Sequence, residues 1–150
     1  MSLPRRRYTY RFVFAPETIG AITYASMHLD ALRASTIAAF NLTCIGDEGD
    51  YSYLASRLGN LEIDRIARHV LSTRSPAVEY SYLDRGSDER QYGMPGIDLP
   101  MISLMRTKYG AYPEYHTSFD DLTVVTPAGL QGGLDLVREC MEVLEVNDYY

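Results

Sequence analysis

Several residue types are scarce in this chain. Its 150 residues include no tryptophan, two cysteines and three histidines. Cys44 and Cys140 lack the close spacing of a zinc knuckle or a redox pair, so we expect two buried thiols. No apolar run approaches the roughly 18 residues of a membrane span, and none near the N-terminus is long enough for a signal-peptide core. These absences predict a cytoplasmic protein without a membrane partner.

Positive charge is also scarce, because 14 Lys and Arg residues are outnumbered by 20 Asp and Glu residues, giving a net charge of −6. Nucleic acid requires a basic face that neutralises its phosphates, and the run from Arg5 to Arg7 is too short to provide one. We therefore expect no nucleic-acid partner. Apolar residues make up 46% of the chain, which is ordinary for a globular protein, and residues 1–150 suffice for a single domain with one core.

Hydrophobic periodicity divides the chain into alternating strands and helices. Four segments are typical of strands, and the last of them is an unbroken apolar run: 8–14, 36–45, 77–83 and 99–105. Three segments have apolar residues at helical spacing: 17–33, 61–73 with Asn60 as N-cap, and a last helix with Thr126 as N-cap and Pro127 at its first position. This alternation predicts an α/β protein of three layers, αβα, with a mostly parallel sheet.

The most unusual polar residues surround the apolar strand 99–105. The segment from Gly86 to Arg90 precedes that strand, and the segment from Tyr115 to Asp120 follows the loop after it. Ligands of α/β sheets gather at strand ends, and loops rich in Gly, Pro and Tyr hold side chains in fixed positions. We therefore predict that residues 86–121 form one wall of an active-site cleft that contains His116.

Two motifs of this stretch resemble those of a known family. One is His116-Thr117-Ser118-Phe119-Asp120, and the other is Ser87-Asp88-Glu89 followed by a strand that begins after Gly96. They are similar to segments of the aminopeptidase-like zinc hydrolases, which include bacterial leucyl-type aminopeptidases and glutaminyl cyclases, and most similar to an uncharacterised bacterial branch. The resemblance covers nearly the whole chain and implies the C-terminal half of a zinc aminopeptidase domain.

The resemblance also implies site residues. It makes His116 a zinc ligand, and it makes Glu17 either a ligand or the general base that takes a proton from metal-bound water. Asp47, or alternatively Asp50, is a further candidate ligand, because both lie close to the position of the family's aspartate. Four more residues are expected to face substrate or to support the ligands: Asp88, Glu89, Tyr115, which would orient His116, and Asp120.

The chain departs from the family's pattern at several positions. Pro16 stands where the family has the first of two adjacent glutamates, and Thr43 stands where it has an aspartate ligand. The family's His-x-Asp segment belongs upstream of this sequence. His28-Leu29-Asp30 has the same spacing, but it falls in a helical pattern in which the side chains i and i+2 point about 200° apart. We therefore expect a truncated domain.

The candidate ligands can also be explained without a catalytic or metal-binding role. A single loop histidine such as His116 is usually a hydrogen-bonded surface residue, and a carboxylate at a helix start such as Glu17 is favoured by the macrodipole. Asp47 lies in an acidic loop, 46–50, that can simply be solvated, since it lacks the full pattern of a calcium loop.

Two functions remain open at this point. The first is part of a zinc-dependent aminopeptidase-like hydrolase that is incomplete and inactive alone and acts on a peptide or a small amine-bearing substrate. Glu89, where the family often has His, adds a negative charge that suits such an amine. The second is a non-catalytic binding or assembly module that keeps the fold. A domain without its upstream strands would expose a sheet edge, so we also expect a homodimer.

Overall fold

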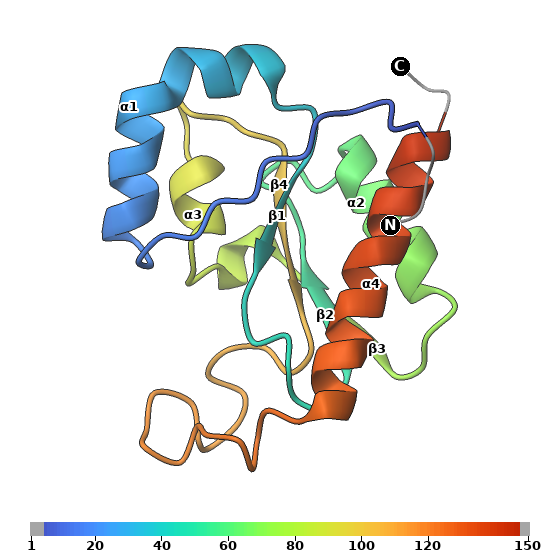
Figure 1. Ribbon diagram of the computed structural model, residues 1–150. Helices are drawn as coiled ribbons and strands as arrows, with labels where there is room; N and C mark the ends of the chain where they lie inside the picture. Colours follow the sequence, from blue (N-terminus) through green and yellow to red (C-terminus); the bar gives the residue numbers. More distant parts are fainter. Residues whose placement is uncertain (1–4, 148–150) are drawn as a thin grey trace.

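The computed structural model describes residues 5–147, which form one central sheet with helices on both sides (Figure 1). Along the chain the elements are α1 (Ile19–Ser35), β1 (Ala39–Leu42), β2 (Tyr51–Leu54), α2 (Glu62–Leu71), β3 (Ala77–Tyr80), the 3-10 helix η1 (Tyr82–Asp84), α3 (Glu89–Tyr92), β4 (Met101–Met105) and α4 (Pro127–Val146).

The sheet has the strand order β1-β4-β2-β3. β1 runs parallel to β4 and β2 runs parallel to β3, whereas β2 and β4 are antiparallel. The predicted α/β fold with a mostly parallel sheet is therefore confirmed. All five residues of β4 are buried, as expected for an unbroken apolar strand that is covered on both faces.

The side chains of β4 alternate between two apolar layers. Ile102 and Leu104 face α2 and α4, where the largest core cluster forms. Met101 points to the opposite face, into a smaller cluster with α1 and the region of α3. Figure 1 shows the same arrangement, with α1 and α3 on one side of the strands and α2 and α4 on the other.

Helix starts are fixed by side chains at two positions. Thr126 is the N-cap of α4, because its Oγ1 accepts a hydrogen bond of 2.9 Å from the Gly129 amide, and Pro127 follows it as predicted. The predicted N-cap Asn60 of α2 is wrong, since the helix follows Leu61. The buried Asp64 carboxylate accepts from the Leu61 amide at 2.9 Å and from the Ser56 amide at 2.8 Å, which ties the helix start to the end of β2.

The predicted strand 8–14 is the main error in the fold. The structure assigns no strand to these residues, although they run as an extended segment past the sheet, as Figure 1 shows. Phe12 and Phe14 are 71% and 95% exposed. A strand requires a neighbour for its backbone hydrogen bonds, and the sheet described for residues 5–147 does not extend to this segment.

The fourth strand is instead β2, which the sequence pattern did not indicate. It has only four residues, and its polar residue Ser52 is buried, so the apolar alternation is broken. The Ser52 hydroxyl donates to the Arg106 carbonyl at 2.6 Å, which satisfies it within the sheet. Cys140 is buried as predicted, but Cys44 is only partly buried. None of the helices within residues 5–147 has both the length and the apolar character needed to cross a bilayer.

Candidate functional site

Three segments that are distant in sequence meet beside the start of α1. They are the Glu17-Thr18 turn, the start of α3 at Asp88, and the loop after β4 that contains Tyr115 and His116. The Thr18 amide donates a hydrogen bond of 2.8 Å to Asp88 Oδ1. The loop after β4 reaches the same helix, because Tyr109 OH donates a hydrogen bond of 3.1 Å to Oε1 of Glu89, the residue after Asp88.

Glu17 is presented by a strained turn. Thr18 has φ 62° and ψ −70°, and the Ile19 amide donates to the Glu17 carbonyl at 2.7 Å. These values describe the rare, strained form of the three-residue γ-turn, which is especially unfavourable for a β-branched residue. The bond to Asp88 holds the turn, and Arg90 adds a second bond to the Thr18 hydroxyl at 3.2 Å. The exposed Glu17 side chain is therefore fixed at its base.

His116 is held against a tyrosine. Its imidazole stacks on the Tyr115 ring with 3.9 Å between centroids and 17° between planes. The centroid of the Tyr115 ring lies 6.4 Å from that of Tyr109 and 5.7 Å from that of Tyr112. His116 is exposed and has φ 60°, a backbone conformation that is uncommon for a residue with a side chain. The tyrosine cluster thus fixes the plane of an otherwise accessible imidazole.

Backbone strain is concentrated in this part of the molecule. Among residues 5–147, four residues other than glycine have positive φ: Thr18, Cys44, Asp98 and His116. Thr18 and His116 belong to the segments described above, and Cys44 contacts the loop that contains His116, because its Sγ lies 3.6 Å from the Tyr112 hydroxyl. Strained backbone persists where the surrounding structure holds it, which is typical of functional sites.

The site carries negative charge. Burial raises the pKa of Asp88, the charges of Glu17 and Glu89 raise it further, and the Thr18 amide opposes them. Burial, followed by the negative charge of Glu17 and with a smaller part from Asp120, also raises the pKa of Tyr115. Asp120 itself is exposed and accepts from the Tyr112 hydroxyl at 3.0 Å. A cation would relieve this repulsion between like charges.

Glu89 lies beneath the site and is fully buried, with 0% exposure. Burial alone would raise its pKa, but hydrogen bonds led by that from Ser103 outweigh burial and hold the pKa below its usual value. Five groups donate to the carboxylate: the Gly86 amide at 2.8 Å, the Ser87 amide at 3.0 Å, Asn41 Nδ2 at 2.9 Å, Ser103 Oγ at 2.8 Å and Tyr109 OH at 3.1 Å. In the sequence, the polar residues Asn41 and Ser103 stand within two largely apolar strand segments, and their presence there could have indicated a buried hydrogen-bond acceptor.

Asp47, the third candidate ligand, is hydrogen-bonded to residues in its own loop and at the end of β4. Its carboxylate accepts from the Thr107 hydroxyl at 2.6 Å and from the Thr107 amide at 3.1 Å, and it also accepts from the Gly49 amide at 2.8 Å. These bonds join the segment after β1 to the end of β4. Asp47 therefore stabilises a loop connection with both of its oxygens.

The described residues do not fit a complete zinc site. A catalytic zinc ion takes three protein ligands and one water or substrate molecule. Within residues 5–147, no group of three or more His, Cys, Asp and Glu side chains is arranged so that it could hold a metal ion. Glu17 and His116 can supply at most part of such a ligand set.

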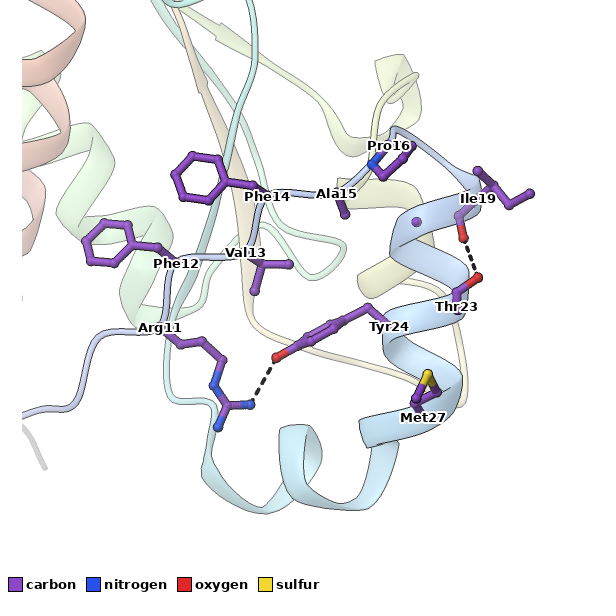
Figure 2. A pocket seen from close by; sticks show the side chains of 11 residues that line it. Arg11, Phe12, Val13, Phe14, Ala15, Pro16, Ile19, Thr23, Tyr24 and Met27 are labelled. Atoms are coloured by element: carbon purple, nitrogen blue, oxygen red, sulfur yellow. Dashed lines mark hydrogen bonds between the residues drawn. The ribbon is translucent and has the colours of Figure 1, made fainter.

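An apolar groove borders the site on the other side of Glu17. It has a volume of about 610 Å³ and lies between residues 11–16 and the first turns of α1 (Figure 2). Arg11 donates to the Tyr24 hydroxyl at 3.0 Å and so bridges the two segments. Figure 2 shows that Phe12 and Phe14 point away from α1, whereas Val13 lies between the segment and the helix.

Comparison with known proteins gives one family and a consistent fold. A family described as "Domain of unknown function (DUF4910)" matches residues 1–147. The chain is 40% identical over 151 residues to a Clostridium acetobutylicum protein that is provisionally named a polysaccharide biosynthesis protein with an aminopeptidase-like domain. That match covers 100% of this chain and 34% of the relative, so the chain spans about a third of the relative's length.

Solved structures agree with this match. A crystal structure of a Clostridium acetobutylicum protein, provisionally named a peptidase, has a TM-score of 0.90 and 40% identity, and the match covers 95% of this chain and 34% of that one. An aminopeptidase from Aneurinibacillus sp. strain AM-1 has a TM-score of 0.64 at 19% identity, covering 85% and 30% of the two chains. A zinc aminopeptidase from Bacillus subtilis has a TM-score of 0.62 at 17% identity, covering 88% and 34%. These two distant structures show that the fold is aminopeptidase-like.

Proposed function

The chain belongs to the DUF4910 family, and from this premise and the aminopeptidase-like fold we propose that it is one part of a hydrolase domain. In this proposal it contributes Glu17 and His116 to the active site. The observation that carries it is that the Glu17-Thr18 turn and the loop with Tyr115 and His116 are both hydrogen-bonded to the start of α3, at Asp88 and Glu89. Because the chain spans 34% of its Clostridium relative, we propose that the missing zinc ligands lie in the part of such a protein that it does not match.

The proposed substrate is a peptide or another molecule with a free amine. Glu17 and Asp88 place two carboxyl groups near each other, and the neighbouring ring of Tyr115 can add a cation–π contact. An ammonium group would relieve the repulsion that raises the pKa of Asp88. The residues of this chain would thus bind and orient the amine end of a substrate, and the chain alone would not hydrolyse it.

A zinc titration followed by NMR of the histidine side chains tests this proposal. The chain has three histidines, so the imidazole signals can be assigned with His28→Ala, His69→Ala and His116→Ala. We expect zinc to shift the His116 signals first, with weak affinity because the ligand set is incomplete. Glu17→Gln should weaken this response, whereas Glu79→Gln, on the distant β3, should not.

Two results would contradict the proposal. If zinc shifts all three histidines equally, or if Glu17→Gln has no effect on the His116 response, then Glu17 and His116 do not share a site. If the chain by itself releases amino acids from peptides in the presence of zinc, then it is a complete enzyme and the description as one part of a domain is wrong.

A second function, a non-catalytic binding module, is favoured by the lack of a three-ligand group among the described residues and by Pro16 and Thr43 at two family ligand or base positions. An amino-acid amide such as leucine amide distinguishes the two functions. Both predict that it perturbs Tyr115 and His116. Only the hydrolase function predicts that the longer Clostridium relative, loaded with zinc, cleaves it.

We also propose that the chain forms a homodimer through the apolar surface of residues 11–16 and α1. Phe12 and Phe14, which point away from α1, are largely exposed, and so is Ile19 on the helix itself. Several large exposed apolar side chains in one region are typical of protein interfaces, and an extended segment outside the sheet can pair with a second strand.

A further inference from the structure

The Glu89 carboxylate has an unusual environment for a buried charge. All five of its hydrogen-bond donors are uncharged groups of the protein. A buried carboxylate is tolerated only when its oxygens are well supplied with donors, because it otherwise loses its hydration without compensation. Five donors are enough to occupy the roughly four lone-pair positions that a carboxylate offers. The five hydrogen bonds therefore hold the Glu89 carboxylate in one position.

The two oxygens of Glu89 divide these donors between the sheet and the site. Oε2 accepts from Asn41 Nδ2 at 2.9 Å and from Ser103 Oγ at 2.8 Å. Asn41 and Ser103 lie opposite each other in the parallel pair β1 and β4, and Asn41 Nδ2 also donates to Ser103 Oγ at 3.1 Å. This oxygen is thus held by two paired strands of the sheet, β1 at its edge and β4 inside it.

Oε1 is connected to the Glu17 side of the site. It accepts from the amides of Gly86 and Ser87, the residues that lead into α3. The next residue along the chain is Asp88, whose carboxylate holds the Thr18 amide in the strained turn. The position of Glu17 therefore depends on Asp88, and the position of Asp88 depends on the bonds of its neighbour Glu89.

The same oxygen is connected to the His116 side of the site. Tyr109 OH donates to Oε1 at 3.1 Å, and the Tyr109 ring contacts Tyr115, on which His116 stacks. The Tyr109 ring also packs closely on Gly86, because a Cβ added at Gly86 would lie only 2.8 Å from it. The orientation of the His116 ring therefore depends on the Glu89 carboxylate, as the position of Glu17 does.

We propose that Glu89 is the positioning residue of the candidate site. Through Oε2 it is anchored to the sheet, and through Oε1 it sets the distance and orientation between the Glu17 turn and the Tyr115-His116 pair. It does not touch substrate. This inference rests on the proposed function for its purpose, but the geometry that it predicts can be tested without any ligand.

The variant Glu89→Gln tests this role with almost no change in volume. Its amide nitrogen would face hydrogen-bond donors, so at least two of the five bonds must rearrange. In the wild type, the Tyr115 ring should displace the His116 imidazole proton signals upfield. We expect Glu89→Gln to lose this displacement and to shift the Ile19 amide signal, while the His69 signals on α2 stay unchanged. Zinc affinity at His116 should fall by about 10-fold, as is typical when a residue behind a ligand is replaced.

A second variant keeps the test valid if Glu89→Gln does not fold. Tyr109→Phe removes only the hydroxyl that reaches Glu89, and Tyr80→Phe is its matched control in the same apolar cluster. Tyr109→Phe should alter the His116 signals and leave the Ile19 amide unchanged, and Tyr80→Phe should alter neither. Unchanged His116 signals in Tyr109→Phe, or in folded Glu89→Gln, would overturn the proposal. If the signals respond but wild-type His116 binds neither zinc nor leucine amide, the positioning role holds and the proposed function fails.

Discussion

The two faces of the sheet differ in how completely they are covered. On one face, α2 and α4 bury side chains such as Ile102, Leu104 and Leu136, all with 0% exposure. On the other face, the residues that α1 buries are Ala21, Ala25 and Leu32, while Ile19 and Met27 of the same helix remain exposed. The candidate site lies on this second, thinly covered side. The comparison indicates that stability comes mainly from the α2 and α4 face, and that the α1 face is available for binding.

The largest difference between the two faces is expected in the free energy of unfolding when a core leucine is shortened. Leu136→Ala leaves a cavity in the middle of α4 and should lower the free energy of unfolding by about 2–5 kcal/mol. Ile22→Ala, on the exposed side of α1, should cost less than about 1 kcal/mol because little apolar surface is uncovered. Urea denaturation of both variants measures the difference. Equal losses would show that the α1 face is as well packed as the other.

A smaller effect is expected from pH at the edge of the α1 face, where Asp88 and Glu89 respond in opposite directions. Burial and the charge of Glu17 raise the pKa of Asp88, so its contribution to stability is present below its ordinary pKa of about 3.9 and is lost as pH rises through the raised pKa. Burial also acts against ionised Glu89, but hydrogen bonds lower its pKa. Its contribution is therefore present above its ordinary pKa of about 4.3 and is lost as pH falls through the lowered pKa.

Asp88→Asn isolates the first of these contributions, because the amide oxygen can still accept from Thr18. We expect the variant to lose less stability than the wild type as pH rises from about 4 to 7, and to be at least as stable at neutral pH. Thermal unfolding across this range measures it. Asp30→Asn, an exposed carboxylate on α1, serves as the control and should follow the wild type. A steeper loss in Asp88→Asn would contradict the assigned direction.

The well-packed face is also the part that the sequence predicted best. The apolar stripes of α2 and α4 and the unbroken run of β4 identify the core, because periodicity reports burial directly. Local patterns could not show that the aromatic alternation of 8–14 lacks a neighbouring strand, or that Tyr51 to Leu54 has one. Pairing depends on segments that are distant in sequence, and a four-residue strand with a buried serine gives little local signal.

For the candidate site, the sequence could suggest residues but not the backbone that positions them. The meeting of Glu17, Asp88 and His116 depends on the Thr18 turn, whose positive φ is strained for a β-branched residue and could not be expected from sequence. The sequence predicts that Glu89 either faces substrate or supports the ligands, and the second alternative agrees with its five donors inside the protein. A carboxylate has the same appearance in sequence whether its donors are water molecules or buried groups.

The smallest effect on folding should come from Phe14, on the exposed segment that leads into α1, although its effect on association should be large. Phe14→Ser removes an aromatic ring that is 95% exposed, so the free energy of unfolding should change by less than about 0.5 kcal/mol. If this face forms the homodimer, the wild type should approach twice its mass of 17.0 kDa as concentration rises, and the variant should stay near that mass. Light scattering over a concentration series measures both.

Leu122→Ser is the matched control for this experiment, because Leu122 is also highly exposed but lies in the loop before α4. An equal loss of association in Leu122→Ser would mean that any exposed apolar side chain promotes contact, and that the α1 face is not special. A wild type that stays monomeric would reject the homodimer. The exposed apolar surface would then have to bind another partner. The contrast between the two faces would still hold, because burial under α2 and α4 stabilises the fold and the exposed α1 side is available for binding.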